Sequence, residues 1–146
     1  MPEPGQEIEG AGSRLRFVET AESSGGERVV VEVAYDGAGS PPPVHLHPSQ
    51  EERFEVLEGE MHVVVDGERA VRRAGERYVI PAGAEHSMWA EGAARQRWET
   101  APALRTDAFL ETAWGFQTRT PSPEEVGAFL ERFAEEVRFV GPPPER

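Results

Sequence analysis

The chain has 146 residues, of which 29% are charged and 38% hydrophobic, and its formal net charge is −12. This length and composition fit a single globular domain. Nucleic acids and anionic membranes attract clusters of basic residues, so the acidic balance argues against both as partners. Cysteine and lysine are absent, which excludes disulfides, thiolate ligands and Schiff-base chemistry on a lysine. The sequence has no long apolar run, and we expect a cytoplasmic protein.

The first hundred residues have the pattern of a β-protein. Residues 1–13 are rich in Pro, Gly and Glu, and we expect a flexible tail there. Residues 14–104 contain short strand-length runs that are separated by turn residues, and this spacing predicts an all-β antiparallel sandwich or barrel. The expected strands cover residues 14–20, 27–35, 53–58, 61–67, 77–81, 86–90 and 95–99.

Residues 105–146 predict a helical C-terminal extension of the same domain. Apolar residues of the segment 106–116 lie on one side of a helical wheel. A second helix is expected to begin at Ser122, because Glu125 stands where a capping box requires it and Pro123 suits the first turn. Its helical spacing places five apolar residues on one face: Val126, Phe129, Leu130, Phe133 and Val137. We expect this face to dock on the outside of the barrel, with the barrel mouth, a neighbouring subunit and a mobile lid as alternatives.

Three histidines and one glutamate form a candidate metal site. His45 and His47 are two residues apart, and on a strand such residues point to the same face. Glu52 follows closely in the sequence, and His86 stands just after a turn that contains Pro81. Imidazoles and a carboxylate together suit a divalent transition metal. The sequence therefore predicts a metal site formed by His45, His47, Glu52 and His86.

The same residues belong to two spaced motifs. The first is Gly39-x5-His45-x-His47-x4-Glu52-x6-Gly59, and the second is Gly75-x5-Pro81-x-Gly83-x2-His86. Both resemble the motifs of the cupin family, and the short stretch between them is similar to that of compact bacterial members. The resemblance implies an antiparallel double-stranded β-helix, or jelly roll, with the C-terminal helices packed on it. It also implies one divalent metal ion per chain (Fe, Mn, Ni or Zn), bound by the four residues of the candidate site.

Two details of the motifs need comment. The second cupin motif often ends in Asn, where this chain has Ala90; that residue is not usually a ligand, so its loss leaves the metal prediction in place. Glu51 is an alternative ligand to Glu52, but only Glu52 keeps the motif's spacing to Gly59.

Strand alternation predicts which side chains surround the metal. If Glu52 and His86 face inward, Phe54 and Met88 do so as well. The expected substrate pocket consists of Phe54, Tyr78, Met88, Gln96 and Trp98, a mostly apolar set that suits a planar or aromatic molecule. His62 has the opposite parity, so we expect it to face outward. Apolar residues on outward strand faces favour a homodimer.

These features favour one activity and leave two alternatives open. The expected function is that of a metal-dependent enzyme, most simply a dioxygenase, which acts on a small aromatic or enolisable substrate with Glu52 as the catalytic base. The first alternative is a redox-neutral cyclase or isomerase in which Zn or Ni acts as a Lewis acid. The second is a module that binds a small molecule without catalysis. The sequence alone does not separate these.

Overall fold

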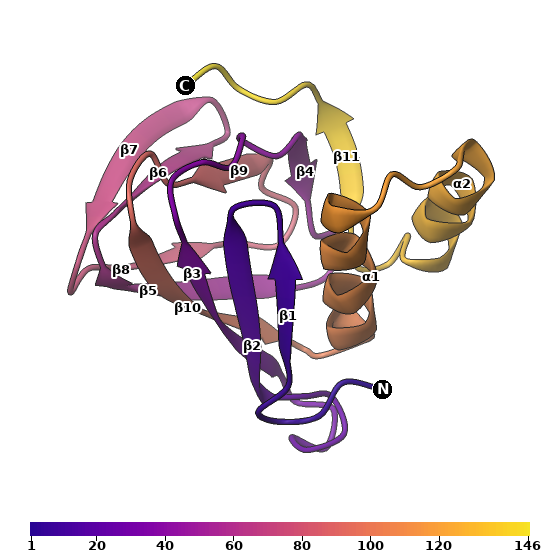
Figure 1. Cartoon of the computed structure of the whole chain (residues 1–146). Helices are drawn as coiled ribbons and strands as arrows, with labels where there is room; N and C mark the ends of the chain where they lie inside the picture. The colour runs from indigo at the N-terminus through magenta and orange to yellow at the C-terminus, as the bar shows by residue number, and fades with distance from the viewer.

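The computed structural model describes residues 1–146 and shows two antiparallel β-sheets with two helices beside them (Figure 1). The elements in chain order are β1 (Glu7–Gly10), β2 (Ser13–Glu19), β3 (Val29–Tyr35), β4 (Val44–Leu46), β5 (Glu51–Glu58), β6 (Glu60–Val65), β7 (Glu68–Arg73), β8 (Arg77–Ile80), β9 (His86–Trp89), β10 (Ala94–Ala101), α1 (Thr106–Thr118), α2 (Pro123–Arg132) and β11 (Arg138–Gly141).

The strands form a six-stranded sheet in the order β1-β2-β3-β10-β5-β8 and a five-stranded sheet in the order β11-β4-β9-β6-β7. Neighbours in each sheet are often far apart in sequence, as in β10, which lies between β3 and β5. This is the antiparallel double-stranded β-helix that the sequence predicts, with the C-terminal helices packed on it.

One face of the six-stranded sheet supplies both halves of the core. Trp98 on β10 stands opposite Val31 on one side and Phe54 on the other, so all three side chains share this face. Around β5 and β8 the face packs against the five-stranded sheet, and we call this the sheet half: Phe54, Val56, Met61, Val63, Tyr78, Ile80, Ala84, Met88, Ala90 and Ala94. Around β2 and β3 it packs against the helices, and we call this the helix half: Leu15, Phe17, Val29, Val31, Val33, Ala103, Phe109, Leu110, Trp114, Phe129, Phe133 and Val137.

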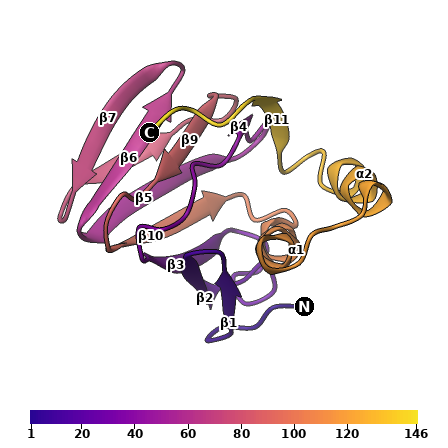
Figure 2. The same ribbon diagram turned by 45° about the horizontal axis from the view of Figure 1, so that its top comes forward.

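The position of the helices corrects the prediction that they dock on the outside of the barrel. They cover the part of the inner face that the five-stranded sheet leaves open, with α1 beside β1 and β2 (Figure 2). Trp98 and Trp114 meet where the two halves join, with ring centroids 5.8 Å apart. An apolar stripe shows that a helix has a buried face, but it does not show which of two apolar surfaces receives it.

The second helix begins as predicted and ends earlier than predicted. Ser122 accepts a hydrogen bond from the backbone N–H of Glu125, whose side chain accepts one from the Ser122 N–H, so the capping box is present. The chain then leaves the helix after Arg132 and becomes extended in β11, which pairs with β4. Only part of the apolar stripe is buried: Phe129, Phe133 and Val137 are buried, whereas Val126 is 37% and Leu130 42% exposed. Neither helix is long and apolar enough to cross a membrane.

Four strands were missed by the sequence pattern. The prediction of a flexible tail over residues 1–13 is wrong for β1, which pairs with β2 as a hairpin and places Ile8 against the helix half. The C-terminal extension, residues 105–146, is likewise not helical throughout, because it ends in β11. β4 is short and β7 is almost entirely polar, so neither shows the apolar alternation that identifies a strand.

The turn between β5 and β6 requires the motif glycine. Gly59 has a φ of +71°, and a Cβ atom there would lie 2.3 Å from the carbonyl oxygen of Ala93. Any side chain would therefore clash with the backbone. This turn sets where β6 starts and hence how the five-stranded sheet lies over β5.

Candidate metal centre

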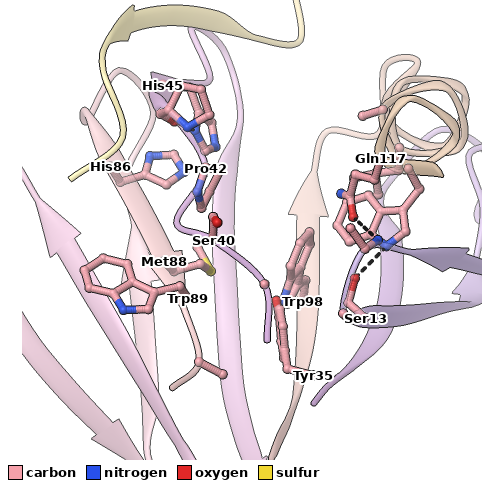
Figure 3. A pocket seen from close by; sticks show the side chains of 18 of the residues that line it. Ser13, Tyr35, Ser40, Pro42, His45, His86, Met88, Trp89, Trp98 and Gln117 are labelled. Carbon is pink, nitrogen blue, oxygen red and sulfur yellow. Dashed lines mark hydrogen bonds between the residues drawn. The ribbon is translucent and has the colours of Figure 1, made fainter. Parts of the chain in front are cut away.

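The three motif histidines come together on the five-stranded sheet. His45 on β4 stands directly opposite His86 on β9, so both rings lie on the same face, and His47 follows β4. One ring nitrogen from each lies within 4.8 Å of the others, a grouping that fits a single metal ion. Figure 3 shows His45 and His86 facing each other at one end of a cavity. The sequence prediction of these three residues as one cluster is confirmed.

Hydrogen bonds to the backbone fix the orientation of all three rings. The Nδ1 atoms of His45, His47 and His86 lie 2.9, 2.7 and 2.9 Å from the carbonyl oxygens of Pro43, Glu136 and Ala84. A carbonyl oxygen only accepts, so each Nδ1 carries the proton and donates it. Each neutral ring then keeps a lone pair on Nε2, the arrangement in which histidine binds a metal while its other nitrogen is held by an outer hydrogen bond.

Glu52 on β5 brings a carboxylate to the cluster from the six-stranded sheet. Its Oε1 atom lies 3.0 Å from Nε2 of His47 and 3.3 Å from Nε2 of His86. Its Oε2 atom accepts a hydrogen bond of 3.4 Å from the Thr100 hydroxyl. Oε1 of Glu52 and Nε2 of His86 are both buried and have no hydrogen-bond partner.

Two unpartnered acceptors that face each other in a buried site repel one another, and a bound cation would satisfy both. The donor set therefore fits a divalent transition metal, with the three histidine Nε2 atoms and Oε1 of Glu52 as the ligands that face it. Glu51 is partly exposed and lies near Arg53, which argues for Glu52 over the alternative.

The environment sets the charge of each group. Burial, together with the neighbouring imidazoles, lowers the pKa of His45 to about 4 and keeps it neutral. Burial alone would lower the pKa of His47, but the adjacent Glu52 carboxylate outweighs it and the pKa of His47 is raised. Burial likewise opposes ionisation of Glu52, yet the two nearby imidazoles outweigh burial and hold the pKa of Glu52 well below its usual range. The carboxylate is thus ionised and able to bind a cation.

We call the four candidate ligands, His45, His47, Glu52 and His86, the metal cluster. This cluster opens into a cavity of about 480 Å³ between the sheets and α1. Of the five predicted pocket residues, Met88 and Trp98 line it. Phe54 and Tyr78 do not, because they stack on each other within the sheet half. Gln96 does not either, because it is fully buried, where it accepts a hydrogen bond from Tyr78. Strand parity correctly predicts that a side chain faces inward, but not whether another side chain lies between it and the cavity.

Other parts of the cavity wall come from segments whose contribution is not predicted by the alternation of side chains along a strand. The β1–β2 hairpin contributes Ser13, the end of β3 contributes Tyr35, and α1 contributes the apolar face and polar end listed here: Phe109, Leu110, Ala113, Trp114 and Gln117. The only sequence signal was the apolar side of the helix over residues 106–116. Its use as a cavity wall depends on long-range docking.

The C-terminal segment also supports the metal cluster. The Glu136 carbonyl that accepts from His47 precedes β11, which pairs with the strand that carries His45. The Glu136 side chain is 1% exposed and accepts a hydrogen bond from the backbone N–H of Arg105. A segment distant in sequence therefore holds a ligand ring in place.

His62 lies away from the cluster, in line with its strand parity. Its ring stacks on Trp89, with centroids 5.6 Å apart, and its Nδ1 atom lies 3.6 Å from a carboxylate oxygen of Glu91. His62 is therefore available as a control position for tests of the metal cluster.

Comparison with known proteins agrees with this site and fold. The family model described as "Cupin domain" matches residues 29–99. An RmlC-like cupin from Shewanella frigidimarina is 24% identical, with 70% of this chain and 88% of that chain covered and a TM-score of 0.61. Ectoine synthase from P. lautus is 16% identical, with 95% and 83% covered and a TM-score of 0.60. KdgF from Halomonas sp. is 18% identical, with 70% and 90% covered and a TM-score of 0.60. No curated protein sequence matches the chain.

The structure is a jelly-roll barrel whose histidine cluster, at β4 and β9, is compatible with a single metal ion. Together with the family match over both motifs, it places the chain in the cupin superfamily, as a small single-domain member. The structural likenesses at these identities describe the fold and not the reaction.

Proposed function

We propose that the chain is a metal-dependent dioxygenase that acts on a small, ring-containing organic substrate. The observation that carries this proposal is the convergence of three oriented histidines and one ionised glutamate at the end of an apolar cavity. A bound Fe or Mn ion would supply the redox chemistry for dioxygen at these ligands. In the reaction proposed, both atoms of O2 enter the substrate and the substrate itself supplies the four electrons, so no separate reductant is needed.

The chain's own residues have distinct tasks in this reaction. The three histidines hold their Nε2 atoms toward one point because the backbone carbonyls fix their Nδ1 atoms. Glu52 is ionised, and its Oε2 is held by Thr100. Its Oε1 faces the metal position as a ligand, so Glu52 acts as the base for an acidic substrate group only when Oε1 does not bind the metal. The two sheets and α1 surround the cavity in which this reaction would occur.

The lining of the cavity indicates the substrate class. The side chains that line it include five Phe and Trp side chains, together with Met88 and Leu110. Glu52 is the only carboxylate among them, and none is an arginine. Apart from a bound metal ion, a phosphorylated or multiply anionic substrate would find no Arg or Lys side chain there. The cavity therefore suits a neutral or weakly acidic aromatic or enolisable molecule.

The test measures the metal content of the purified full-length protein and its oxygen consumption with flavonols, diketones and other enolisable aromatics. We expect Fe or Mn near one per chain and oxygen uptake that depends on the added compound. The variant His47→Ala should lose both, and the matched control His62→Ala should keep both. Oxygen uptake that survives in His47→Ala would contradict the proposal.

Two other outcomes point to the alternatives. Tightly held Zn or Ni, with conversion of a substrate but no oxygen uptake, would identify a redox-neutral cyclase or isomerase. Ligand binding without conversion would identify a binding module. The metal found after purification also reflects metal availability, so the activity of the protein reconstituted with each metal decides between these alternatives.

The homodimer stays a prediction, which light scattering of the full chain tests.

A further inference from the structure

The loop that joins two ligands of the metal cluster carries a buried glutamine. His47 follows β4 of the five-stranded sheet, and Glu52 lies on β5 of the six-stranded sheet. Only residues 48–51 connect them, so the path of this loop sets how closely the Glu52 carboxylate approaches the His47 ring. Gln50 is the one buried side chain of the loop and is 1% exposed. It is therefore the side chain through which the interior of the protein holds this loop.

The side-chain amide of Gln50 anchors the loop to the segment between β10 and α1 (Figure 1). Its Nε2 atom donates to the carbonyl oxygens of Pro102 and Ala103 at 2.8 and 3.1 Å, and to the Thr106 hydroxyl oxygen at 2.7 Å. The amide has two hydrogens, so one of them is shared between two acceptors. The partners are 52 to 56 positions away in the sequence. These bonds therefore fix the loop relative to a distant part of the chain.

An apolar residue at position 50 would avoid a cost that the glutamine carries. The Oε1 atom of Gln50 is buried and has no hydrogen-bond partner, and a buried acceptor without a partner is unfavourable. Hydrophobic contact alone would hold the loop against the interior, but such contact has no preferred direction. Hydrogen bonds from one planar amide do have preferred directions. The glutamine thus gives the loop a defined position.

The segment between β10 and α1 is also connected to both ligands by other contacts. Thr100 on β10, just before this segment, stands opposite Glu52 in the sheet and donates to its Oε2 atom. The backbone N–H of Arg105 donates to the side chain of Glu136, whose carbonyl oxygen lies 2.7 Å from Nδ1 of His47. The segment thus reaches each of the two ligands, and the buried glutamine ties the loop between them to the same segment.

We propose that Gln50 is a positioning residue, whose amide holds the loop 48–51 so that His47 and Glu52 face the same metal ion. This inference rests on the metal cluster of the proposed function, but not on the reaction that occurs there. Replacement of the amide leaves all four ligands in the chain and lowers the affinity with which they bind a metal. The expected loss is that of an outer-shell change at a metal site, about ten- to a hundredfold.

The experiment is a titration of the full chain with Co²⁺, whose visible absorption reports both the affinity and the arrangement of the ligands. Gln50→Met keeps the length of the side chain and removes its N–H donors. We expect the Co²⁺ affinity to fall by about tenfold or more and the absorption bands to shift.

The matched control is Gln96→Met. Gln96 is also fully buried and hydrogen-bonded through its amide, but it pairs with Val56 further along the sheet and not with Glu52. This variant should lower the midpoint of urea unfolding, as Gln50→Met does, yet keep the Co²⁺ affinity and the bands of the wild type. A role of Gln50 in stability alone would give the same result in both variants.

A second pair of variants carries the test if Gln50→Met does not fold. Thr106→Val replaces the hydroxyl by a methyl group of similar size and removes one acceptor of the Gln50 amide. The Co²⁺ affinity should then fall by about threefold, as the loss of one hydrogen bond would give. Thr106→Ser keeps the hydroxyl and should keep the affinity. Equal affinities in these two variants would overturn the proposal.

The outcomes separate this proposal from the proposed function. Unchanged Co²⁺ affinity and bands in Gln50→Met, or an equal loss in Gln96→Met, would overturn the positioning role and leave the metal cluster and its reaction in place. A wild-type chain that bound no Co²⁺ would overturn both proposals. Selective loss of Co²⁺ affinity in Gln50→Met, in a protein without oxygen uptake, would support the positioning role and contradict only the dioxygenase.

Discussion

The sheet half and the helix half of the core lie on the same face of one sheet, yet they are held together differently. In the sheet half, the turn from β5 to β6 links the two sheets, and Gly59 in this turn sets how they meet. In the helix half, α1 and α2 contact the sheet through side chains, among them Phe109, Phe129 and Phe133. The sheet half follows from the alternation of apolar side chains along the strands. The helix half depends on how helices far away in the sequence pack on the sheet.

The cavity lies where the two halves meet, and this explains its composition. The metal cluster comes from strands, which hold ligands at fixed spacing, while the opposite wall comes from α1 and the β1–β2 hairpin. We therefore expect that substitutions in the metal cluster change metal affinity, and that substitutions in the opposite wall change which molecules the cavity binds. The following predictions test that separation.

The largest effect is expected from Phe133→Ala in the helix half. Phe133 is fully buried and contacts Phe109 and Phe129, so its truncation should lower the free energy of unfolding by about 3–5 kcal/mol. The control Leu130→Ala, at a side chain 42% exposed, should change it by about 0.5 kcal/mol or less. Urea unfolding measures both. Equal losses in the two variants would show that α2 does not dock as described.

The next largest effect is expected from His47→Ala in the metal cluster. Its removal takes away a ligand, so metal affinity should fall by about a hundredfold or more, beyond the effect of typical outer-shell changes. Titration with Zn or Co measures the affinity, and His62→Ala should leave it unchanged. Full metal retention in the double variant His45→Ala/His86→Ala would contradict the assignment of the cluster.

Metal affinity should also fall as the pH is lowered. Protons and metal compete for the imidazole Nε2 atoms, whose ordinary titration lies at about pH 6–7. The raised pKa of His47 means that this ring takes up a proton first as the pH falls, whereas His45, with a pKa of about 4, stays neutral for longer. Metal content measured after dialysis across this range checks the direction. Constant occupancy down to pH 4 would argue against imidazole ligands.

The smallest effect is expected from Glu136→Gln, in the C-terminal segment that contacts the metal cluster. Glu136→Gln weakens the contact with Arg105 that anchors the segment whose carbonyl holds His47. We expect metal affinity to fall by about tenfold or less, at the lower end of outer-shell effects. The neighbouring Glu135→Gln, at an exposed position, is the matched control. If the two variants bind metal equally well, the C-terminal segment has no part in positioning the ligand.

Local patterns in the sequence were enough to predict the metal cluster and most of the barrel. His45 and His47 share a face because strand side chains alternate, and His86 follows a turn that leads into the strand opposite. The helix start at Ser122 was equally predictable, since a capping box involves only residues within one turn. These features depend on residues close together in the chain, so the local sequence is enough to predict them.

Tertiary structure alone decided the surroundings of the cluster. The docking of α1 on the inner face, the contact of Glu136 with His47, and the separation of Gln96 from the cavity by its neighbours all join residues far apart in sequence. Apolar surfaces attract one another without direction, so a hydrophobic stripe does not specify its partner.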